Sequence, residues 1–407
     1  MKNRLLFSGM LLIPMMLLAQ KEKPWPSQST HQVRKAGFYE EIRRENQETT
    51  KSTPAGRFVV DFKNFEVPSD TSLYHVIKHM PSLSQGETGT CWCFAATSFL
   101  EAEIIRQQGK QIKLSEMFFV YHEYIDRAEA YVKSRGNIAF SEGSESSSVP
   151  ILLSKYGAMP AEAYTGRPIG KTFHHHRIMV EEMQQYLQSV KQNASWDLEA
   201  VKTCIKSILD HHMGSPPSEF IFKGKTYSAL SFSAEVVKLH PFAFFNFMSN
   251  IRQPQNARAE LVEADNWRHF DGYYNLPLND YMTSIVSALE KGFSICICGD
   301  ISEPGYNSEN GAAIIPSFDI PSSAIDAHAR EYRLENGSTT DDHCIHLVGY
   351  TVYKNQKWFL AKDSGAGGFD CPVKGYRYLH EDFVKLKMMN TLMHGDAARP
   401  ILDRLIK

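Results

Sequence analysis

Apolar side chains recur every three or four positions over long stretches of the chain. Residues 91–108 show this spacing and end at Gly109, and residues 116–133 follow Ser115 with the same spacing. Such periodicity places the apolar groups on one face of a helix, and Ser and Gly are typical residues before and after one. The pattern therefore predicts helices over both segments, and a shorter helix over 149–155.

The helical pattern continues through the middle of the chain and is then replaced by strands. Further helices are predicted over 181–191, 198–211 and 281–291. After Gly292 the period falls to two, and β-rich runs cover 293–298, 343–353 and 357–362. Helices followed by an antiparallel sheet predict the α+β class, with a cleft between the two parts.

The first twenty residues differ from the rest. Lys2 and Arg4 precede an apolar run over 5–18, and Ala19 offers a small residue for cleavage. These are the three parts of a secretory signal peptide. We therefore expect residues 1–19 to be removed and the protein to be exported, to the periplasm or outside the cell. The alternative is an uncleaved membrane anchor, although the run is short for a span.

The remaining composition is that of an ordinary globular protein. The formal net charge is −2 and 43% of the residues are hydrophobic. This near-neutral balance gives no indication of nucleic acid or an anionic membrane as a partner. No later segment is apolar for long enough to span a bilayer, so no stable span is expected after signal cleavage. Residues 20–55 are polar, and we interpret them as an N-terminal arm.

The chain has seven cysteines, an odd number that leaves at least one thiol free even in an exported protein. Cys296 and Cys298 lie two apart in a predicted strand, so they share a face and cannot easily pair with each other. Most of the cysteines are expected to be buried free thiols of the core. Cys91 is the exception.

Cys91 begins a predicted helix, where unpaired backbone N–H groups and the helix dipole favour the reactive thiolate. Gly86 and Gly89 allow the backbone just before it to approach a substrate. Gln85, six residues before Cys91, can donate an amide N–H to the oxyanion that forms when a carbonyl is attacked. The structural alternative is a buried cysteine beside a glycine-containing turn.

His343 heads a predicted strand, and Asp363 follows the next strand along the chain. If these strands form an antiparallel hairpin, both side chains lie at its open end, although the sequence leaves the register undetermined. An imidazole can take the proton of a thiol, and a carboxylate can orient the imidazole. Taken separately, each residue has a structural alternative, which is a packed histidine or an Asp-Ser-Gly turn.

Together these residues resemble the papain-like cysteine peptidases, and within them the bleomycin hydrolase and aminopeptidase C branch. The resemblance extends along most of the mature chain. It is carried by Gln85, Cys91-Trp92, Leu114-Ser115-Glu116, Lys155-Tyr156-Gly157 with Pro160 and Tyr164, Tyr274-Asn275-Leu276-Pro277-Leu278, Asp342-His343, Val348-Gly349-Tyr350 and Lys362-Asp363-Ser364.

The resemblance implies a two-lobed papain-like fold over residues 56–407. Its parts would be a helical lobe (about 85–165), a mostly helical insertion (about 170–290), an antiparallel β-barrel lobe (about 292–395) and a C-terminal tail (396–407). In that branch the tail lies in the cleft, where its carboxylate could pair with the amine of a substrate. A hexamer is implied only as the branch's form of assembly.

The resemblance also implies a role for each site residue. Cys91 would be the nucleophile and His343 the general base. Gln85 would form the oxyanion hole with the Cys91 backbone N–H, and Asp363 would orient the imidazole. The substrate backbone would be held at Gly143 and Ser144, the second of which stands where the family has a glycine. No cofactor or metal is implied.

The expected activity is therefore hydrolysis of peptide bonds, with trimming of N-terminal residues as its form. The alternatives are an endopeptidase, an inactive papain-like scaffold that binds peptides, and an acyltransferase of the transglutaminase or arylamine N-acetyltransferase kind. The last kind also uses Cys, His and Asp, but the spacing of Gln85 and the adjacent Asp342-His343 favour a peptidase.

The chain departs from the family pattern near the expected site. Asp363 replaces an asparagine, and we expect Asp363→Asn to be tolerated because asparagine can still accept the imidazole hydrogen bond. Gly365 and Ala366 replace a tryptophan that covers this bond, so the bond is expected to be wetter and weaker. Thr88 replaces the disulfide cysteine of secreted papains, which fits the bleomycin hydrolase branch.

Two histidine features point elsewhere. The run His174-His175-His176 lacks accompanying Asp, Glu or Cys at ligand spacing, so a solvated loop is predicted rather than a metal site. His346 lies three residues after His343 in a strand, should face the other way and is interpreted as a core histidine.

Overall fold

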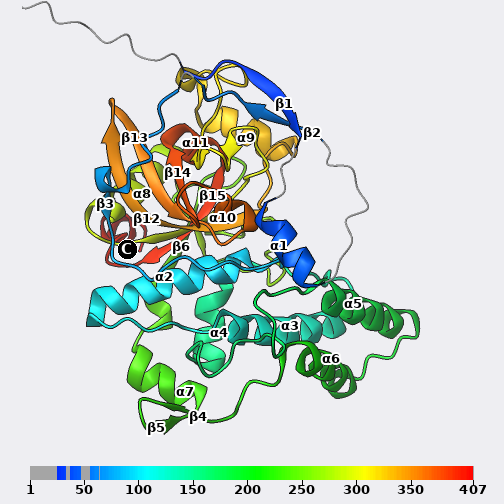
Figure 1. Ribbon diagram of the computed structural model, residues 1–407. Coiled ribbons are helices and arrows are strands. Elements are labelled where there is room, and N and C mark those ends of the chain that lie inside the picture. Colours follow the sequence, from blue (N-terminus) through cyan, green and yellow to red (C-terminus); the bar gives the residue numbers. More distant parts are fainter. Residues whose placement is uncertain (1–24, 34–36, 47–55, 64, 407) are drawn as a thin grey trace, which may run out of the picture.

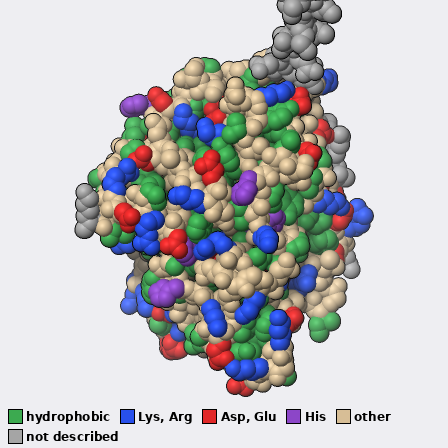
Figure 2. Space-filling view, turned by 90° about the vertical axis from the view of Figure 1, so that its left-hand side faces the viewer, with side chains coloured by type: hydrophobic (Ala, Val, Ile, Leu, Met, Phe, Trp, Pro, Cys, Tyr) green, Lys and Arg blue, Asp and Glu red, His purple; other side chains and the backbone are tan. Residues whose placement is uncertain are grey.

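The computed structural model describes residues 25–33, 37–46, 56–63 and 65–406. The predicted signal peptide, residues 1–19, lies outside these ranges. Within them, no helix is long and apolar enough to cross a membrane. The chain forms two parts, a helical half and a sheet half, and the helical half lies below the sheet half in Figure 1. On the face shown in Figure 2, acidic and basic side chains are interspersed rather than gathered into one patch.

The helical half contains the helices that the apolar spacing predicts. They are α2 (Cys91–Gln108), α3 (Glu116–Lys133), α4 (Ser148–Tyr156), α5 (Arg177–Gln192) and α6 (Leu198–Met213). Gly109 ends α2 in the left-handed region with φ of 67°, which glycine adopts without strain. The Ser115 hydroxyl caps α3 by accepting the Phe118 N–H at 3.1 Å. Local capping chemistry thus sets the ends of both helices that flank the site.

The sheet half is built on one large sheet of eleven strands. Its main path runs β10 (Tyr306–Asn307), β11 (Ala312–Ala313), β14 (Tyr376–His380), β13 (Gln356–Lys362), β12 (His343–Tyr353), β9 (Ile295–Gly299), β15 (Met388–His394), β6 (Phe244–Met248), β8 (Tyr273–Asn275) and β7 (Ala257–Ala259), and β3 (His75–Val76) pairs with β12. Among the described strands, β10 and β7 end this path without pairing to each other. The expected barrel is therefore wrong, because the described sheet is open.

The segment expected to be a mostly helical insertion also adds strands to this sheet. It contains α5, α6, α7 (Ala229–Phe232), α8 (Leu278–Glu290) and the hairpin β4 (Phe220–Phe222) and β5 (Lys225–Tyr227). However, β6, β7 and β8 from the same segment extend the large sheet beyond β15. These strands have three to five residues, which is too short for periodicity to distinguish a strand from a helix.

Both faces of the sheet are covered by apolar contacts. Helix α2 packs on one face, where Phe99 and Leu100 are fully buried with Leu392 of β15. Helices α8 and α11 (Glu381–Lys387) cover the other face, where Ile285 and Phe383 are fully buried. The remaining elements are α9 (Ala327–Glu335), α10 (Ala366–Phe369), α12 (Arg399–Leu405), the 3-10 turns Thr71–Leu73, Pro241–Ala243 and Ser322–Ala324, and the π-helical turn Ser233–Val237.

The described residues of the N-terminal arm pack against the rest of the chain. Its strand β1 (Ser29–Val33) pairs with β2 (Gly56–Val60) at the edge of the sheet half. Its helix α1 (Phe38–Glu45) lies where the two halves meet, as Figure 1 shows. The Phe38 ring stacks on Phe369 of the sheet half with centroids 5.0 Å apart, and it contacts Phe173 of the helical half edge-on.

The cysteines differ from expectation at one pair. Cys298 of β9 and Cys344 of β12 lie directly opposite each other and form a disulfide. Cys91, Cys93, Cys204, Cys296 and Cys371 are free. Strand pairing brings together two cysteines that are 46 residues apart, which is a proximity that sequence spacing does not reveal.

We expect the double variant Cys298→Ala/Cys344→Ala to lower the free energy of unfolding. A cross-link that closes a loop of 46 residues restricts the unfolded chain by about 4 kcal/mol at room temperature. Urea unfolding of the oxidised proteins measures this loss. The free, half-buried Cys204 supplies the control Cys204→Ala. An unchanged urea midpoint in the double variant would show that the bond contributes nothing to stability.

Candidate active site

Cys91 lies at the first position of α2 and opens into a cleft between the two halves. The cleft has a volume of about 780 Å³. Its walls also include Gln85, Gly143, Asp265, Asp342, His343, Asp363 and Arg377. The first helical N–H groups have no partner within their own helix, so the positive end of the helix dipole lies at the Cys91 thiol.

His343 is the first residue of β12 and its ring meets both Cys91 and Asp363. Its Nε2 lies 2.8 Å from Asp363 Oδ1, which leaves Nδ1 as the ring atom for the thiol. Burial alone would lower the pKa of His343, but the charges of Asp363 and Cys91 and their hydrogen bonds to the ring raise it to about 10. The arrangement therefore favours an imidazolium beside the sulfur.

The Asp363 carboxylate accepts four hydrogen bonds. His343 Nε2 and the Gly365 N–H approach Oδ1 at 2.8 and 2.9 Å. The Tyr306 hydroxyl and Arg377 Nε donate to Oδ2 at 2.9 and 2.7 Å. Burial raises the pKa of Asp363, but the neighbouring His343 and Arg377 hold it well below its usual range. The carboxylate is therefore charged and fixed in orientation.

Arg377 and Tyr306 are functional-site residues that the sequence analysis missed. The Arg377 guanidinium lies 3.9 Å from the centre of the Tyr306 ring, and both side chains are buried. They cover the His343–Asp363 bond from the side of β14 and β10, and only 1% of Asp363 is exposed. The expected wetter bond is therefore wrong, because an arginine and a tyrosine exclude water there. No motif marks either residue, since only strand pairing brings them beside Asp363.

Gln85 is held beside Cys91 by hydrogen bonds of both its side chain and its backbone. Its Nε2 donates to the Thr88 carbonyl at 2.7 Å, and its Oε1 accepts from the Ser364 hydroxyl at 2.7 Å. Its backbone N–H donates to the Ser364 carbonyl at 2.9 Å. An amide nitrogen carries two hydrogens, so one donor remains beside those bonds. The Gln85 side chain is thus oriented from both halves of the protein, at the wall of the cleft.

Gly143 and Ser144 have different surroundings. Gly143 lines the cleft, and its carbonyl accepts from the Arg127 guanidinium of α3. The Ser144 hydroxyl points away from the cleft, donating to Glu123 Oε1 at 2.6 Å and contacting Ser148 Oγ at 2.8 Å. The structure therefore brings Gly143 together with Cys91, whereas the Ser144 side chain belongs to the buried polar contacts behind it.

The similarity to known structures agrees with this arrangement. The chain superposes on PepW of Lactobacillus rhamnosis HN001, a cysteine peptidase of the bleomycin hydrolase and aminopeptidase C type, with a TM-score of 0.65. The sequences are 14% identical, and the match covers 82% of this chain and 84% of PepW. This chain has the papain-like fold.

Two other papain-like structures are less similar. A mite allergen from a study of Blo t 1 and Der p 1 gives a TM-score of 0.42 at 13% identity, over 82% of this chain and 73% of the allergen. Procathepsin L 3 from the larval midgut of Tenebrio molitor gives 0.38 at 13% identity, over 90% of this chain and 83% of the enzyme. Both similarities are too weak to add to the assignment. No protein-family model matches the sequence.

Within the papain-like fold, the C-terminal tail does not lie in the cleft. None of residues 396–406 lines it. Instead, Leu402 of α12 is buried in the core beside α8, and Arg404 pairs with Asp280 of α8 at 2.6 Å. The described residues of the tail therefore differ from the arrangement in that branch, because the apolar side of α12 packs on the sheet half.

The run His174–His176 is not a solvated loop. His175 and Glu87 form an isolated parallel β-bridge, and the Glu87 N–H donates to the His174 carbonyl at 2.9 Å. Burial lowers the pKa values of His174 and His176. The run therefore supports the loop that precedes Cys91. The described residues contain no group of three or more His, Cys, Asp or Glu that could hold a metal ion.

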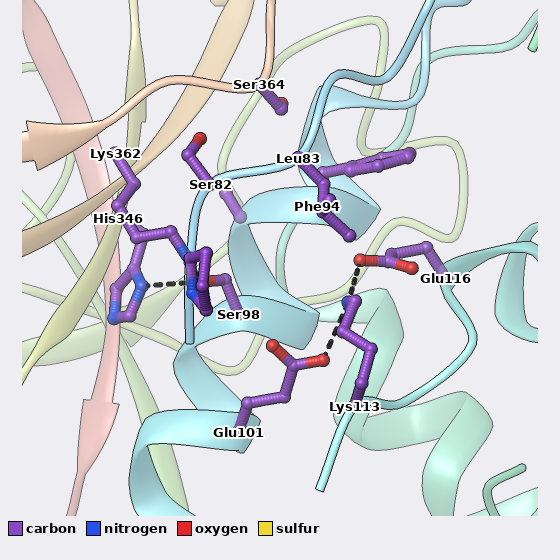
Figure 3. A pocket seen from close by; sticks show the side chains of 12 residues that line it. Ser82, Leu83, Phe94, Ser98, Glu101, Lys113, Glu116, His346, Lys362 and Ser364 are labelled. Atoms are coloured by element: carbon purple, nitrogen blue, oxygen red, sulfur yellow. Dashed lines mark hydrogen bonds and ion pairs between the residues drawn. The ribbon is translucent and has the colours of Figure 1, made fainter. Parts of the chain in front are cut away.

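His346 faces away from the cleft, as its spacing predicts. Its Nδ1 lies 2.8 Å from Ser98 Oγ of α2, inside the small cavity shown in Figure 3. Lys362 donates to the same hydroxyl at 2.6 Å, and burial lowers the pKa of Lys362 to about 8. These bonds join β12 and β13 to the helix that carries Cys91, so His346 contributes to the position of that helix.

Contrary to the sequence-based expectation, the structure indicates that Asp363→Asn is damaging. Both carboxylate oxygens already accept from N–H or O–H groups, so an amide NH₂ would face a donor and the buried Arg377 would lose its charge partner. Breaking a buried ion pair costs about 3–5 kcal/mol. Urea unfolding and activity assays test this, with the exposed Asp403→Asn as control. Wild-type values for Asp363→Asn would contradict the four-donor arrangement.

The His343–Asp363 pair also predicts a dependence of stability on pH. His343 has a raised pKa in the fold, so its contribution is complete below about pH 6.5 and disappears as the pH rises towards about 10. Asp363 has a lowered pKa, so its contribution is lost only in acid. We expect the stability difference between wild type and His343→Ala to be largest at about pH 5–6 and to shrink above about pH 7. Urea midpoints across this range measure it, and a difference that grows with pH would contradict the assignment.

Proposed function

We propose that this chain is a cysteine peptidase in which Cys91 is the nucleophile and His343 the acid–base group. The proposal is supported chiefly by one observation, the His343 ring held between the Cys91 thiol and the buried Asp363 carboxylate. This is the arrangement that activates a thiol for attack on a carbonyl. The papain-like fold agrees with it.

The chemistry follows from these positions. The Cys91 thiolate attacks the carbonyl carbon of the scissile peptide, and the carbonyl oxygen becomes an oxyanion. The free amide hydrogen of Gln85 and the Cys91 backbone N–H stabilise this charge. The C–N bond then breaks as His343 transfers its proton to the leaving amine, and a thioester remains on Cys91. Water, deprotonated by His343, hydrolyses the thioester and releases the acid.

We further propose that the enzyme removes N-terminal residues, as an aminopeptidase. The similarity to PepW supports this form, because PepW is of the aminopeptidase C type. The described residues of the tail, 396–406, do not line the cleft, and a carboxylate of the cleft wall is the candidate partner for the amine of the substrate. An endopeptidase and an inactive peptide-binding scaffold are the alternatives that the experiments distinguish.

Export of the protein remains a proposal that rests on residues 1–19. The disulfide between Cys298 and Cys344 supports it, because disulfides persist in oxidising compartments outside the cytoplasm.

The test is covalent labelling with E-64, an epoxide that alkylates activated thiols of cysteine peptidases, followed by peptide mapping. We expect one adduct, on Cys91, and none on Cys204, which is also free and half-buried. His343→Ala should slow labelling and peptide hydrolysis by about 10²–10⁴-fold, and Cys91→Ala should abolish both with the fold retained.

Cys204→Ala is the matched control and should label and turn over like wild type. A folded, reduced protein that forms no adduct on Cys91 would favour the inactive scaffold. Hydrolysis at a wild-type rate by Cys91→Ala would remove this residue from the mechanism.

A further inference from the structure

A group of acidic side chains lies beside Cys91 at the Gly143 wall of the cleft. Asp265 lines the cleft itself. Its carboxylate lies so close to Gly143 that a Cβ on this residue would be 2.3 Å from Asp265 Oδ2. The Glu142 carbonyl accepts the Trp92 indole N–H at 3.1 Å, which fixes this wall next to the nucleophile. Asp265 therefore occupies the space above the glycine that adjoins Cys91.

The loop that carries Asp265 is anchored on both sides of this residue. Asn266 Nδ2 donates to the Leu261 carbonyl at 2.9 Å, which closes the loop on itself. The Trp267 indole donates to Glu123 Oε1 of α3 at 2.7 Å, and Arg268 pairs with the same carboxylate. Asp265 itself makes no hydrogen bond or ion pair within 4 Å in the described part of the chain. Its carboxylate is thus presented to the cleft by a rigid support.

Behind Asp265, buried acceptors lack donors. Asn390 Nδ2 donates to Glu145 Oε2 at 3.2 Å and to Asp341 Oδ2 at 2.8 Å. Glu145 Oε1 and Asn390 Oδ1 are buried without a partner among the described residues, and the two side chains are 2% and 0% exposed. Buried acceptors normally have donors. Among the described residues, this group therefore has more acceptors than donors.

Two arginines face this group of acids without a direct ion pair to Asp265. Arg127 faces Asp265 but donates its hydrogen bonds to the carbonyls of Ala139 and Gly143. Arg252 faces Glu263, a further acid of the same group. Burial, together with the neighbouring acids, raises the pKa of Glu145 to about 8 and also raises the pKa of Asp341.

We propose that Asp265, supported by Glu145 and Asp341, binds the cationic group of the substrate on the acyl side of the scissile bond. The proposal rests on the proposed function and specifies its substrate. Two sources share this chemistry, the α-ammonium of a free N-terminus and the basic side chain of a preceding residue. The Asp265 carboxylate above Gly143 favours the first, because it occupies the space where a longer chain would continue. In this enzyme Asp265 then has the role that the C-terminal tail has in the branch that the sequence resembles.

The experiment measures the rate at which Cys91 is alkylated by three chloromethyl ketones. The probes are alanyl, with a free amine, acetyl-alanyl, with the amine blocked, and acetyl-arginyl-alanyl, with a basic residue before the alanine. Iodoacetamide, which is small and neutral, reports the reactivity of the thiol alone. The proteins are wild type, Asp265→Asn and the control Asp271→Asn, an exposed aspartate of the same loop.

We expect wild type and Asp271→Asn to react about 10- to 100-fold faster with the alanyl probe than with its acetylated form. This ratio corresponds to one charge-assisted hydrogen bond between the ammonium of the probe and the Asp265 carboxylate. Asp265→Asn should lose this preference while its rate with iodoacetamide is unchanged. If the acetyl-arginyl-alanyl probe instead shows the preference, and Asp265→Asn loses it, the site is supported with a basic side chain as its ligand.

Equal preferences in wild type and Asp265→Asn, with normal labelling by iodoacetamide, would overturn the cation site and leave the peptidase proposal intact. Failure of Cys91 to react faster than Cys204 with any probe would overturn the proposed function, and the substrate site would fall with it.

Discussion

The buried Asp363 carboxylate is the interaction on which the site depends. A charged group in the interior is tolerated only when its oxygens are fully hydrogen-bonded and an opposite charge is near. Here β12 supplies His343, β14 supplies Arg377, β10 supplies Tyr306, and the chain after β13 supplies the Gly365 N–H. Because the donors come from different strands, the carboxylate can be buried and fully hydrogen-bonded only with this strand order. Once the carboxylate is held in place, the His343 imidazole has one orientation, with its second nitrogen towards Cys91.

The sequence predicted the local elements well, because apolar periodicity and capping residues act over a few positions. It also identified candidate residues of the site, because the helix start at Cys91 and the strand start at His343 are local features. The environment of these residues was not predictable in the same way. Arg377 and Tyr306 reach Asp363 only through pairing of β13 with β14 and of β14 with β11, and strand register cannot be derived from one sequence.

The same limit explains the other differences. The disulfide depends on Cys298 standing opposite Cys344 across β9 and β12. The open sheet depends on short strands of the insertion, which extend it beyond β15 rather than closing a barrel. The position of the tail was inferred from resemblance alone, whereas Leu402 shows that an apolar helix face determines it.

Two segments outside the helical and sheet lobes complete the walls of the cleft, and this bears on specificity. Helix α1 brings Tyr39 to the cleft and is held by Glu45, which accepts the Thr172 and Phe173 N–H groups at 2.7 and 3.0 Å. The insertion brings Asp265. In the proposed mechanism, Cys91, His343 and Asp363 act on any peptide bond that reaches them, so the choice of substrate is left to the walls of the cleft. A carboxylate in the wall beside Cys91 favours a substrate with a free N-terminus, because its ammonium group would lie next to that carboxylate. An internal bond of a long chain has no such ammonium group beside it.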